Sequence, residues 1–183
     1  MTWNRAICIA SGPSLNRADV DRSRQSGWPL IAVNCTWKAI PDCDVIYAGD
    51  WAWWNEFHNL VPSHPALWTC SRKATQDFGI NYFPRGGAFN SGQRAVQFAI
   101  WQGAKTVLLL GYDCSIEQGS HWHGDHTALR NPDVSSAAKW QRHFAVLAEE
   151  AQRAGVKVVN CSARTAISDF QRQSLRTALE EYQ

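Results

Sequence analysis

Short apolar runs that end in small or polar residues recur along the chain, and they predict the strands of a sheet. Each run is continuous rather than alternating, which is typical of strands covered on both faces, as in parallel sheets. The runs are Ala6–Ala10, Leu30–Val33, Val45–Ala48, Thr106–Leu110 and Val156–Val159.

Helical periodicity marks segments between these runs. Gly92–Gln102 carries one apolar stripe with Ser91 as its expected N-cap, and a second helix is expected from about Ser136 to Arg153. Each is followed at once by a strand, so the pattern predicts an α/β fold with a right-handed, mostly parallel sheet and helices on both faces. A third helix is expected from Ser168 or Asp169 through Glu181. Residues 51–85 give no clear pattern, and no boundary divides residues 1–183, so we expect a single domain.

Composition narrows the class of protein. The chain has 183 residues, of which 45% are hydrophobic and 19% charged, and this excludes an intrinsically disordered chain. A net charge of +2 gives no electrostatic footprint for nucleic acid. No apolar run approaches the roughly 20 residues that cross a bilayer. The six cysteines form no C-x-x-C pair, and the N-terminal apolar stretch is too short for a signal peptide. We expect a reduced, cytoplasmic protein.

Ten tryptophans are many for a chain of this length. Trp101 and Trp140 lie in the two amphipathic segments, where we expect them in the core. Five others stand beside predicted strand ends, where some of them are expected to line a binding site or contact another subunit of a homo-oligomer. These five are Trp37, Trp51, Trp53, Trp54 and Trp122.

Polar or small residues follow the predicted strands and are the first candidates for a site. In a doubly wound sheet, ligands bind outside the carboxyl ends of the strands. Any single residue of this kind is more often a turn former or a helix cap, but several of them converge on one edge here. The candidates are Ser11, Gly12, Ser14, Asn34, Asp50, Asp113 and Ser162.

Two loops have the composition of an anion cradle. In Ser11-Gly12-Pro13-Ser14, the glycine permits close backbone approach, the proline suits a first helical turn and the serine offers a hydroxyl. This loop is neither the G-x-G-x-x-G dinucleotide fingerprint nor a Walker loop, which disfavours both cofactors. The glycine-rich stretch from Arg85 to Gly92 is either a second cradle with Arg85 nearby or a flexible loop followed by an ordinary N-cap.

Three histidines fall within six residues, at His121, His123 and His126, with Asp125 among them. Histidine serves both as a general acid or base and as a metal ligand, so both roles stay open beside that of a solvated loop. No G-x-S-x-G signature of a serine hydrolase is present.

Four motifs in order resemble a known superfamily. They are Ile9-Ala10-Ser11-Gly12-Pro13-Ser14-Leu15, Val33-Asn34-Cys35, Asn90-Ser91-Gly92 and Leu110-Gly111-Tyr112-Asp113. This set is similar to the bacterial sialyltransferases of glycosyltransferase family 42 and the related DUF115 proteins, which include archaeal 6-hydroxymethylpterin diphosphokinases and phage-borne members. The resemblance spans about residues 6 to 170.

The resemblance implies a Rossmann-like sheet that binds a nucleotide-activated donor, CMP-sialic acid in the characterised transferases. By position, His126, or else His123, would be the general base that deprotonates the acceptor hydroxyl. The residues that would hold the nucleotide or donor are Ser11, Gly12, Pro13, Ser14, Asn34, Asp50, Asn90, Ser91, Gly92, Asp113, Ser162 and Thr165.

Two departures weaken sialyl transfer. The transferases carry tyrosines after the Gly-x-Asp strand, whereas none stands between Asp113 and His121, and the chain leaves little room for a lid over the acceptor. A divalent ion, Mg²⁺ or Mn²⁺, would instead serve a diphosphokinase. Its candidate ligands are Asp50, Asp113, His121, His123 and Asp125.

Three functions therefore follow as expectations. The first is a nucleotide-dependent, glycosyltransferase-like enzyme with a histidine base. The second is a metal-assisted pyrophosphoryl transferase or nucleotide phosphohydrolase. The third is a nucleotide-binding module without catalysis. The expected compartment is the cytoplasm, which is that of the host for a phage-borne protein.

Overall fold

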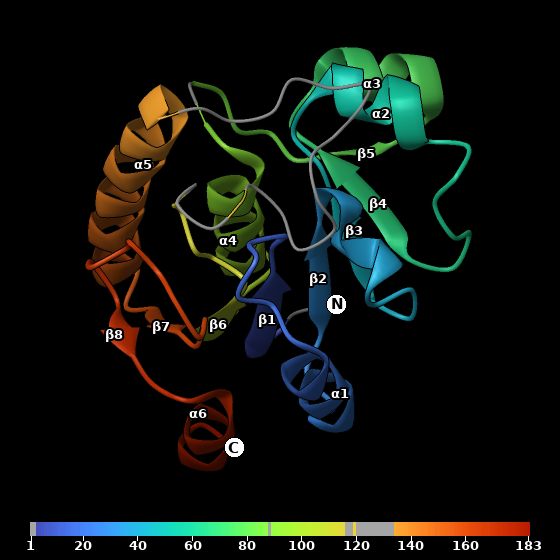
Figure 1. Cartoon of the computed structure of the whole chain (residues 1–183). Coiled ribbons are helices and arrows are strands. Elements are labelled where there is room, and N and C mark those ends of the chain that lie inside the picture. The colour runs from blue at the N-terminus through green and yellow to red at the C-terminus, as the bar shows by residue number, and fades with distance from the viewer. Residues whose placement is uncertain (1–2, 88, 116–118, 120–133) are drawn as a thin grey trace.

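The computed structural model describes residues 3–87, 89–115, 119 and 134–183 (Figure 1). The strands are β1 (Arg5–Ile9), β2 (Leu30–Val33), β3 (Val45–Tyr47), β4 (Ala66–Thr69), β5 (Asn81–Tyr82), β6 (Thr106–Leu110), β7 (Lys157–Asn160) and β8 (Gln171–Arg172). The helices are α1 (Arg17–Gln25), the 3₁₀ helix η1 (Asn34–Lys38), α2 (Trp51–Phe57), α3 (Arg72–Phe78), α4 (Ser91–Trp101), α5 (Val134–Arg153) and α6 (Leu175–Glu181).

The eight strands form one sheet in the order β5-β4-β3-β2-β1-β6-β7-β8, and every neighbouring pair is parallel. The predicted α/β class is confirmed, and the sheet is Rossmann-like: the chain builds outward from β1 to β5 and then returns to β6 on the other side of β1. Strand order thus reverses between β1 and β6, which is where an open α/β sheet leaves a crevice for a ligand.

Helices cover both faces of the sheet, as the continuous apolar runs predict. Side chains of β1 alternate between two cores: Ile7 and Ile9 lie on the side of α1, α2 and α6, while Ala6 and Cys8 lie on the side of α4 and α5 (Figure 1). All six cysteines are free thiols, as expected for a reduced protein. Within the described residues, no helix is both long and apolar enough to span a membrane.

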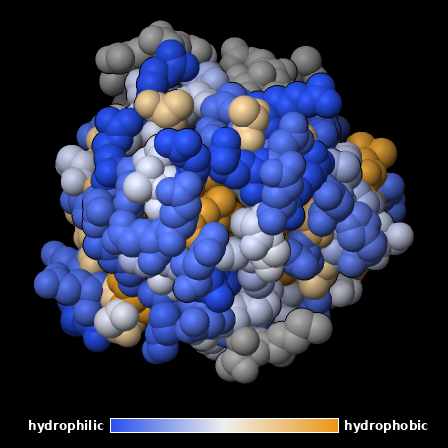
Figure 2. Space-filling model, turned by 90° about the horizontal axis from the view of Figure 1, so that it is seen from below, coloured by the Kyte–Doolittle hydropathy of each residue, from blue (hydrophilic) through white to orange (hydrophobic). Residues whose placement is uncertain are grey.

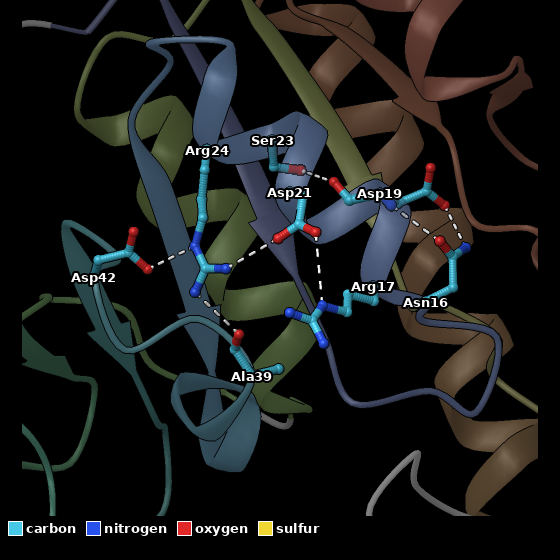
Figure 3. A network of polar contacts seen from close by, with 8 residues as sticks. All are labelled: Asn16, Arg17, Asp19, Asp21, Ser23, Arg24, Ala39 and Asp42. Atoms are coloured by element: carbon cyan, nitrogen blue, oxygen red, sulfur yellow. Dashed lines mark hydrogen bonds and ion pairs between the residues drawn. The ribbon is translucent and has the colours of Figure 1, made fainter.

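A polar network fixes α1 beside the segment that leads into β3 (Figure 3). Arg24 bonds to Asp42 at 2.8 Å, to Asp21 at 3.2 Å and to the carbonyl oxygen of Ala39 at 3.3 Å. These groups are largely solvent-accessible, so each pair contributes only about 0.5 kcal/mol. The surface seen from below, past α1 and α6, is mostly hydrophilic with small separate apolar spots (Figure 2). The candidate site residues lie at the opposite edge of the sheet, at the carboxyl ends of the strands.

Three local predictions were wrong. Asn90, not Ser91, is the N-cap of α4, because its side-chain oxygen accepts from the amide of Gln93 at 2.7 Å. Pro13 is not in a first helical turn, since α1 begins only at Arg17. The last helix is shorter than expected, because the short edge strand β8 occupies residues 171–172 before it.

Three tryptophans differ from the prediction in whether they lie in the core. Trp101 was expected in the core but is 52% exposed, since it ends α4 and only its edge meets Trp68 and Phe83. Trp53 and Trp54 were expected beside the site, yet both are buried in the core on the α2 side of the sheet. These two rings therefore stabilise the fold and do not line a ligand site.

Candidate functional site

The loop after β1 is locked to the end of β6. The carboxylate of Asp113 accepts a hydrogen bond from the Ser14 amide at 2.9 Å and another from the Ser14 hydroxyl at 2.5 Å. Both residues are buried. The interaction joins two segments 99 positions apart in sequence, so Asp113 acts on the shape of the loop.

Two glycines allow this close packing. A Cβ at Gly12 would lie 2.3 Å from the carboxylate of Asp113 and 2.4 Å from the carbonyl oxygen of Gly111. Gly111 itself has a φ of +66°, and a Cβ there would lie 2.3 Å from the carbonyl oxygen of Ala10. Both positions exclude a side chain because a backbone carbonyl oxygen stands in the way, together with the hydrogen-bonded Asp113 carboxylate at Gly12.

A second set of hydroxyls holds the end of β6 from the other side. Ser162 Oγ accepts from the Tyr112 amide at 2.8 Å, and Thr165 Oγ1 donates to the Tyr112 carbonyl at 2.7 Å. Asn160 donates to Thr165 Oγ1 at 3.0 Å. Sequence reasoning placed Ser162 and Thr165 against a base or ribose, but the structure shows both hydroxyls bonded within the protein, where they position the chain around Asp113.

The predicted residues after β2 and β3 lie on the same edge. Asn34 opens η1 with a φ of +51°, a left-handed conformation that asparagine tolerates better than most residues. Asp50 follows β3 at the N-cap position of α2 but makes no side-chain capping bond. Its outer side faces solvent, while partial burial of its carboxyl raises the pKa, and a hydrogen bond from Ser91 opposes that rise.

The start of α4 completes the edge. Ser91 Oγ accepts from the amide of Gly49 at 3.1 Å and so ties the helix to the end of β3. The buried hydroxyl of Tyr112 donates to the carbonyl of Gly92 at 3.2 Å. The N-terminus of α4 is thus fixed from two strands, β3 and β6, with its amides at the crevice.

The glycine-rich loop is bound to the helices and does not form a second cradle around Arg85. The Arg85 guanidinium pairs with Glu150 of α5 at 2.5 Å. Arg94, which is 2% exposed, donates to the carbonyls of Gly86 and Gly87 and lies 5.2 Å from the Phe89 ring centre. The loop is therefore positioned by Arg94 from beneath.

Several buried polar atoms at the start of η1, on or next to α4 and on α5 have no hydrogen-bond partner in the described part of the chain. Sequence reasoning selected Asn34 and Asn90 but missed the others, because the apolar stripe of α4 indicated one buried face and the helix is in fact buried nearly all round. The atoms are Asn34 Oδ1, Asn90 Nδ2, Gln93 Oε1, Arg94 Nε and His143 Nδ1.

An exposed arginine, Arg164, lies at the same edge of the sheet. Arg164, in the loop after β7, is close enough to lower the pKa of Asp113, although burial, the larger influence, raises it above its ordinary value. The Arg164 carbonyl also accepts from the Ser14 hydroxyl at 3.4 Å. Arg164 is a further residue that sequence reasoning missed, since an arginine next to Thr165 carries no signal of its own.

The histidine loop is outside the described residues, and with it the predicted roles of His121, His123, Asp125 and His126. Among the residues that the structure does describe, no three histidine, cysteine, aspartate or glutamate side chains gather in a way that could hold a metal ion. Asp50 and Asp113 therefore form no such group by themselves, and the metal hypothesis stays a prediction.

Comparisons with known proteins do not assign the chain to a family. No family model and no curated protein sequence matches the chain. A UDP-glucose 4-epimerase from Brucella ovis in complex with NAD has 11% identity over 86% of this chain and 51% of its own, with a TM-score of 0.38. A further UDP-glucose 4-epimerase has 13% identity, coverages of 86% and 50%, and a TM-score of 0.37.

A short-chain dehydrogenase/reductase family oxidoreductase from Burkholderia thailandensis has 14% identity, coverages of 87% and 69%, and a TM-score of 0.33. The chain thus spans about half the length of the two epimerases it is similar to. The resemblance to sialyltransferase-like proteins stays a prediction. What the sheet itself establishes is a Rossmann-like α/β fold whose strand order reverses between β1 and β6.

Proposed function

We propose that this chain is a nucleotide-dependent group transferase that binds a nucleotide-activated sugar at the carboxyl edge of the sheet and moves the sugar to a hydroxyl acceptor. The observation that carries the proposal is the unsatisfied polar atoms of Asn34 and Asn90 beside the switch point, next to a loop held rigid by Asp113. Buried polar atoms are almost always paired, so atoms without partners at a crevice indicate a ligand.

The start of α4 suits the phosphates. The first amides of the helix, those of Ser91 and Gly92, have no intrahelical acceptor, and the helix dipole favours negative charge there. Asn90 Nδ2 adds a side-chain donor, and exposed Arg164 adds a cation at the same edge. The Ser11–Ser14 loop lies at the same edge of the sheet, where Gly12 packs against Asp113 and the Gly111 carbonyl.

The transfer step is proposed from the sequence resemblance. His126, or else His123, takes the proton of the acceptor hydroxyl, and the hydroxyl oxygen forms a bond to the anomeric carbon of the sugar. The bond from that carbon to the phosphate oxygen breaks, and its electron pair leaves with the nucleotide. The cations and amides around α4 would stabilise the charge that develops on the leaving phosphate.

Thermal unfolding in the presence of CMP, UDP, GDP, ATP, NAD⁺ and the matching nucleotide sugars tests binding, with and without Mg²⁺. A ligand at 100 times its dissociation constant adds about 2.7 kcal/mol of stability, which is readily measured. Stabilisation by a nucleotide and its sugar conjugate is expected. Stabilisation by NAD⁺ alone, or by no ligand, would contradict the proposal.

Turnover tests the transfer. His126→Ala is expected to abolish sugar transfer and to leave the dissociation constant of the donor unchanged, since a base acts on the acceptor. Activity that requires Mg²⁺ or Mn²⁺ with a nucleoside triphosphate would replace the proposal by the diphosphokinase alternative. Binding without turnover over a panel of acceptors would leave a binding module.

A further inference from the structure

Two glutamines one turn apart on α4 differ in how their amide groups are used. Both are buried, Gln93 at 4% and Gln97 at 5% exposed. Gln97 is fully engaged: its oxygen accepts from Arg94 at 2.5 Å and its nitrogen donates to Glu150 at 2.6 Å. Gln93 donates to the backbone carbonyl of His143 at 3.2 Å, but its Oε1 has no partner among the described residues.

The orientation of the Gln93 amide follows from that contact. If the amide were turned over, its oxygen would face the carbonyl oxygen of His143, and two acceptors cannot bond to each other. Oε1 is therefore the atom left over, and a buried acceptor without a donor costs about 1–3 kcal/mol. Helix α4 bears this cost at its first turn, beside Asn90, whose Nδ2 also has no partner in the described chain.

His143 lies across from Gln93 on α5, and its Nδ1 is likewise buried and unpartnered among the described residues. Burial and three cations, Arg142, Arg94 and Lys139, lower the pKa of His143, so its ring is neutral near pH 7. A neutral imidazole has one donor and one acceptor nitrogen. The contact between α4 and α5 therefore presents two unused groups next to the proposed phosphate site, the acceptor Gln93 Oε1 and His143 Nδ1, whose role as donor or acceptor depends on the tautomer.

We propose that Gln93, together with the His143 ring, binds a hydroxyl or amino group of the ligand whose phosphates lie at the start of α4. An amide oxygen only accepts, and a phosphate near neutral pH has no hydrogen to offer, so the partner of Gln93 Oε1 must carry an O–H or N–H. In a nucleotide sugar these groups are the hydroxyls of the ribose and of the transferred sugar and the N–H groups of the base, which are an amino group in cytosine and an imide N–H in uracil. The inference rests on the proposed function, because it takes the ligand to be such a nucleotide.

The experiment compares Gln93→Leu with Gln97→Leu as a matched control on the same helix. Without ligand, Gln93→Leu is expected to change the unfolding temperature little, because the gain from removing an unsatisfied acceptor offsets the loss of the hydrogen bond to the His143 carbonyl. Gln97→Leu is expected to lower that temperature because it leaves Arg94 and Glu150 without their partner. Gln93→Met, with an unbranched side chain of similar length, serves as a second variant if Gln93→Leu does not pack.

Calorimetric titration with UDP-glucose, CMP-N-acetylneuraminate, UDP, UMP and CMP gives the affinities. Both Gln93 variants are expected to bind the preferred probe at least tenfold more weakly than the wild type, and Gln97→Leu is expected to bind it as the wild type does. A loss confined to the nucleotide sugar assigns the sugar hydroxyls. A loss for CMP but not for UMP assigns the amino group of the base.

Failure of the proposed function and failure of the Gln93 assignment give different results. If the wild type binds none of these probes, the proposed function fails and the assignment of Gln93 falls with it. If the wild type binds a probe and both Gln93 variants bind it equally well, the assignment alone is overturned, and an ordered water satisfies Gln93 Oε1 instead.

Discussion

Two regions of the same sheet edge differ in how their polar groups are satisfied. Around the end of β6, the hydroxyls of Ser14, Ser162 and Thr165 and the carboxylate of Asp113 all bond within the protein. Around the start of α4, the side chains of Asn90 and Gln93 each keep a buried atom without a partner among the described residues. In the first region these side chains hold the chain in place, whereas the second region keeps hydrogen-bonding atoms that are not used within the described chain.

This difference indicates that the two regions have different roles: the first fixes the conformation of the chain, and the second is proposed to bind the ligand. A satisfied buried network is costly to disturb and specifies one arrangement of the chain. An unsatisfied group weakens the free protein but gains a hydrogen bond when a ligand arrives. We therefore expect substitutions in the β6 network to act first on stability, and substitutions at the start of α4 to act first on binding.

The largest effect is expected at Gly12. In Gly12→Ala, the added carbon meets the carboxylate of Asp113 and the Gly111 carbonyl, so the loop must move, at a cost of about 3 kcal/mol. Gly86→Ala is the control, because nothing lies within 4 Å of a Cβ there. Chemical denaturation measures both, and equal stability of the two variants would contradict the packing described for the loop.

The second largest loss of stability is expected for Asp113→Ala. It leaves the Ser14 amide and hydroxyl without their acceptor and is expected to cost about 2 kcal/mol. Asp113→Asn is expected to cost less, because its amide oxygen can accept from the Ser14 amide while its nitrogen donates to the hydroxyl oxygen. Unfolding curves of the two variants should therefore separate; if they coincide, the hydrogen bonds of Ser14 do not determine the role of Asp113.

Substitutions of Asn90 test the region around the start of α4. Asn90→Asp keeps an oxygen for the Gln93 amide and thus the cap of α4, while Asn90→Ala removes the cap and is expected to cost about 1 kcal/mol. Both lose the Nδ2 donor, so both are expected to weaken nucleotide binding, by tenfold or more for the aspartate, which also brings a negative charge. Normal binding by Asn90→Asp would remove Asn90 from the phosphate site.

The smallest effect concerns pH. Burial raises the pKa of Asp113, so the folded protein holds this proton to a higher pH than the unfolded chain does. The stabilisation from the protonated carboxyl is present at low pH and is lost as the pH rises through the folded-state pKa. The unfolding temperature of Asp113→Asn should therefore gain on that of the wild type between about pH 3 and pH 7. A constant difference would contradict the raised pKa.

The sequence predicted the central part of the fold because its strands are apolar and covered on both faces. β1, β2, β3, β6 and β7 all lie within one or two residues of the predicted runs. The segment from Trp51 to Arg85 was not interpretable, since its strands β4 and β5 lie toward one edge of the sheet, where burial is incomplete. Edge strands carry a weak pattern because fewer of their side chains reach the core.

The position of the candidate residues in the fold was predictable, but their contacts were not. Candidate residues at strand ends do gather at one edge, because parallel strands end together. Spacing cannot say whether a hydroxyl such as that of Ser162 bonds to a ligand or to the protein, as it does here. Nor can it find Gln93, whose significance depends on the neighbour that its oxygen lacks.

Amide chemical-shift mapping during titration with a nucleotide sugar tests the central claim most directly. The account predicts that the shifts concentrate on the Ser11–Ser14 loop, on Asn34 and on the first turn of α4. It also predicts no change around α1 and α6 at the opposite edge. Shifts at the opposite edge, or none with any nucleotide, would contradict a nucleotide site at the carboxyl ends of the strands.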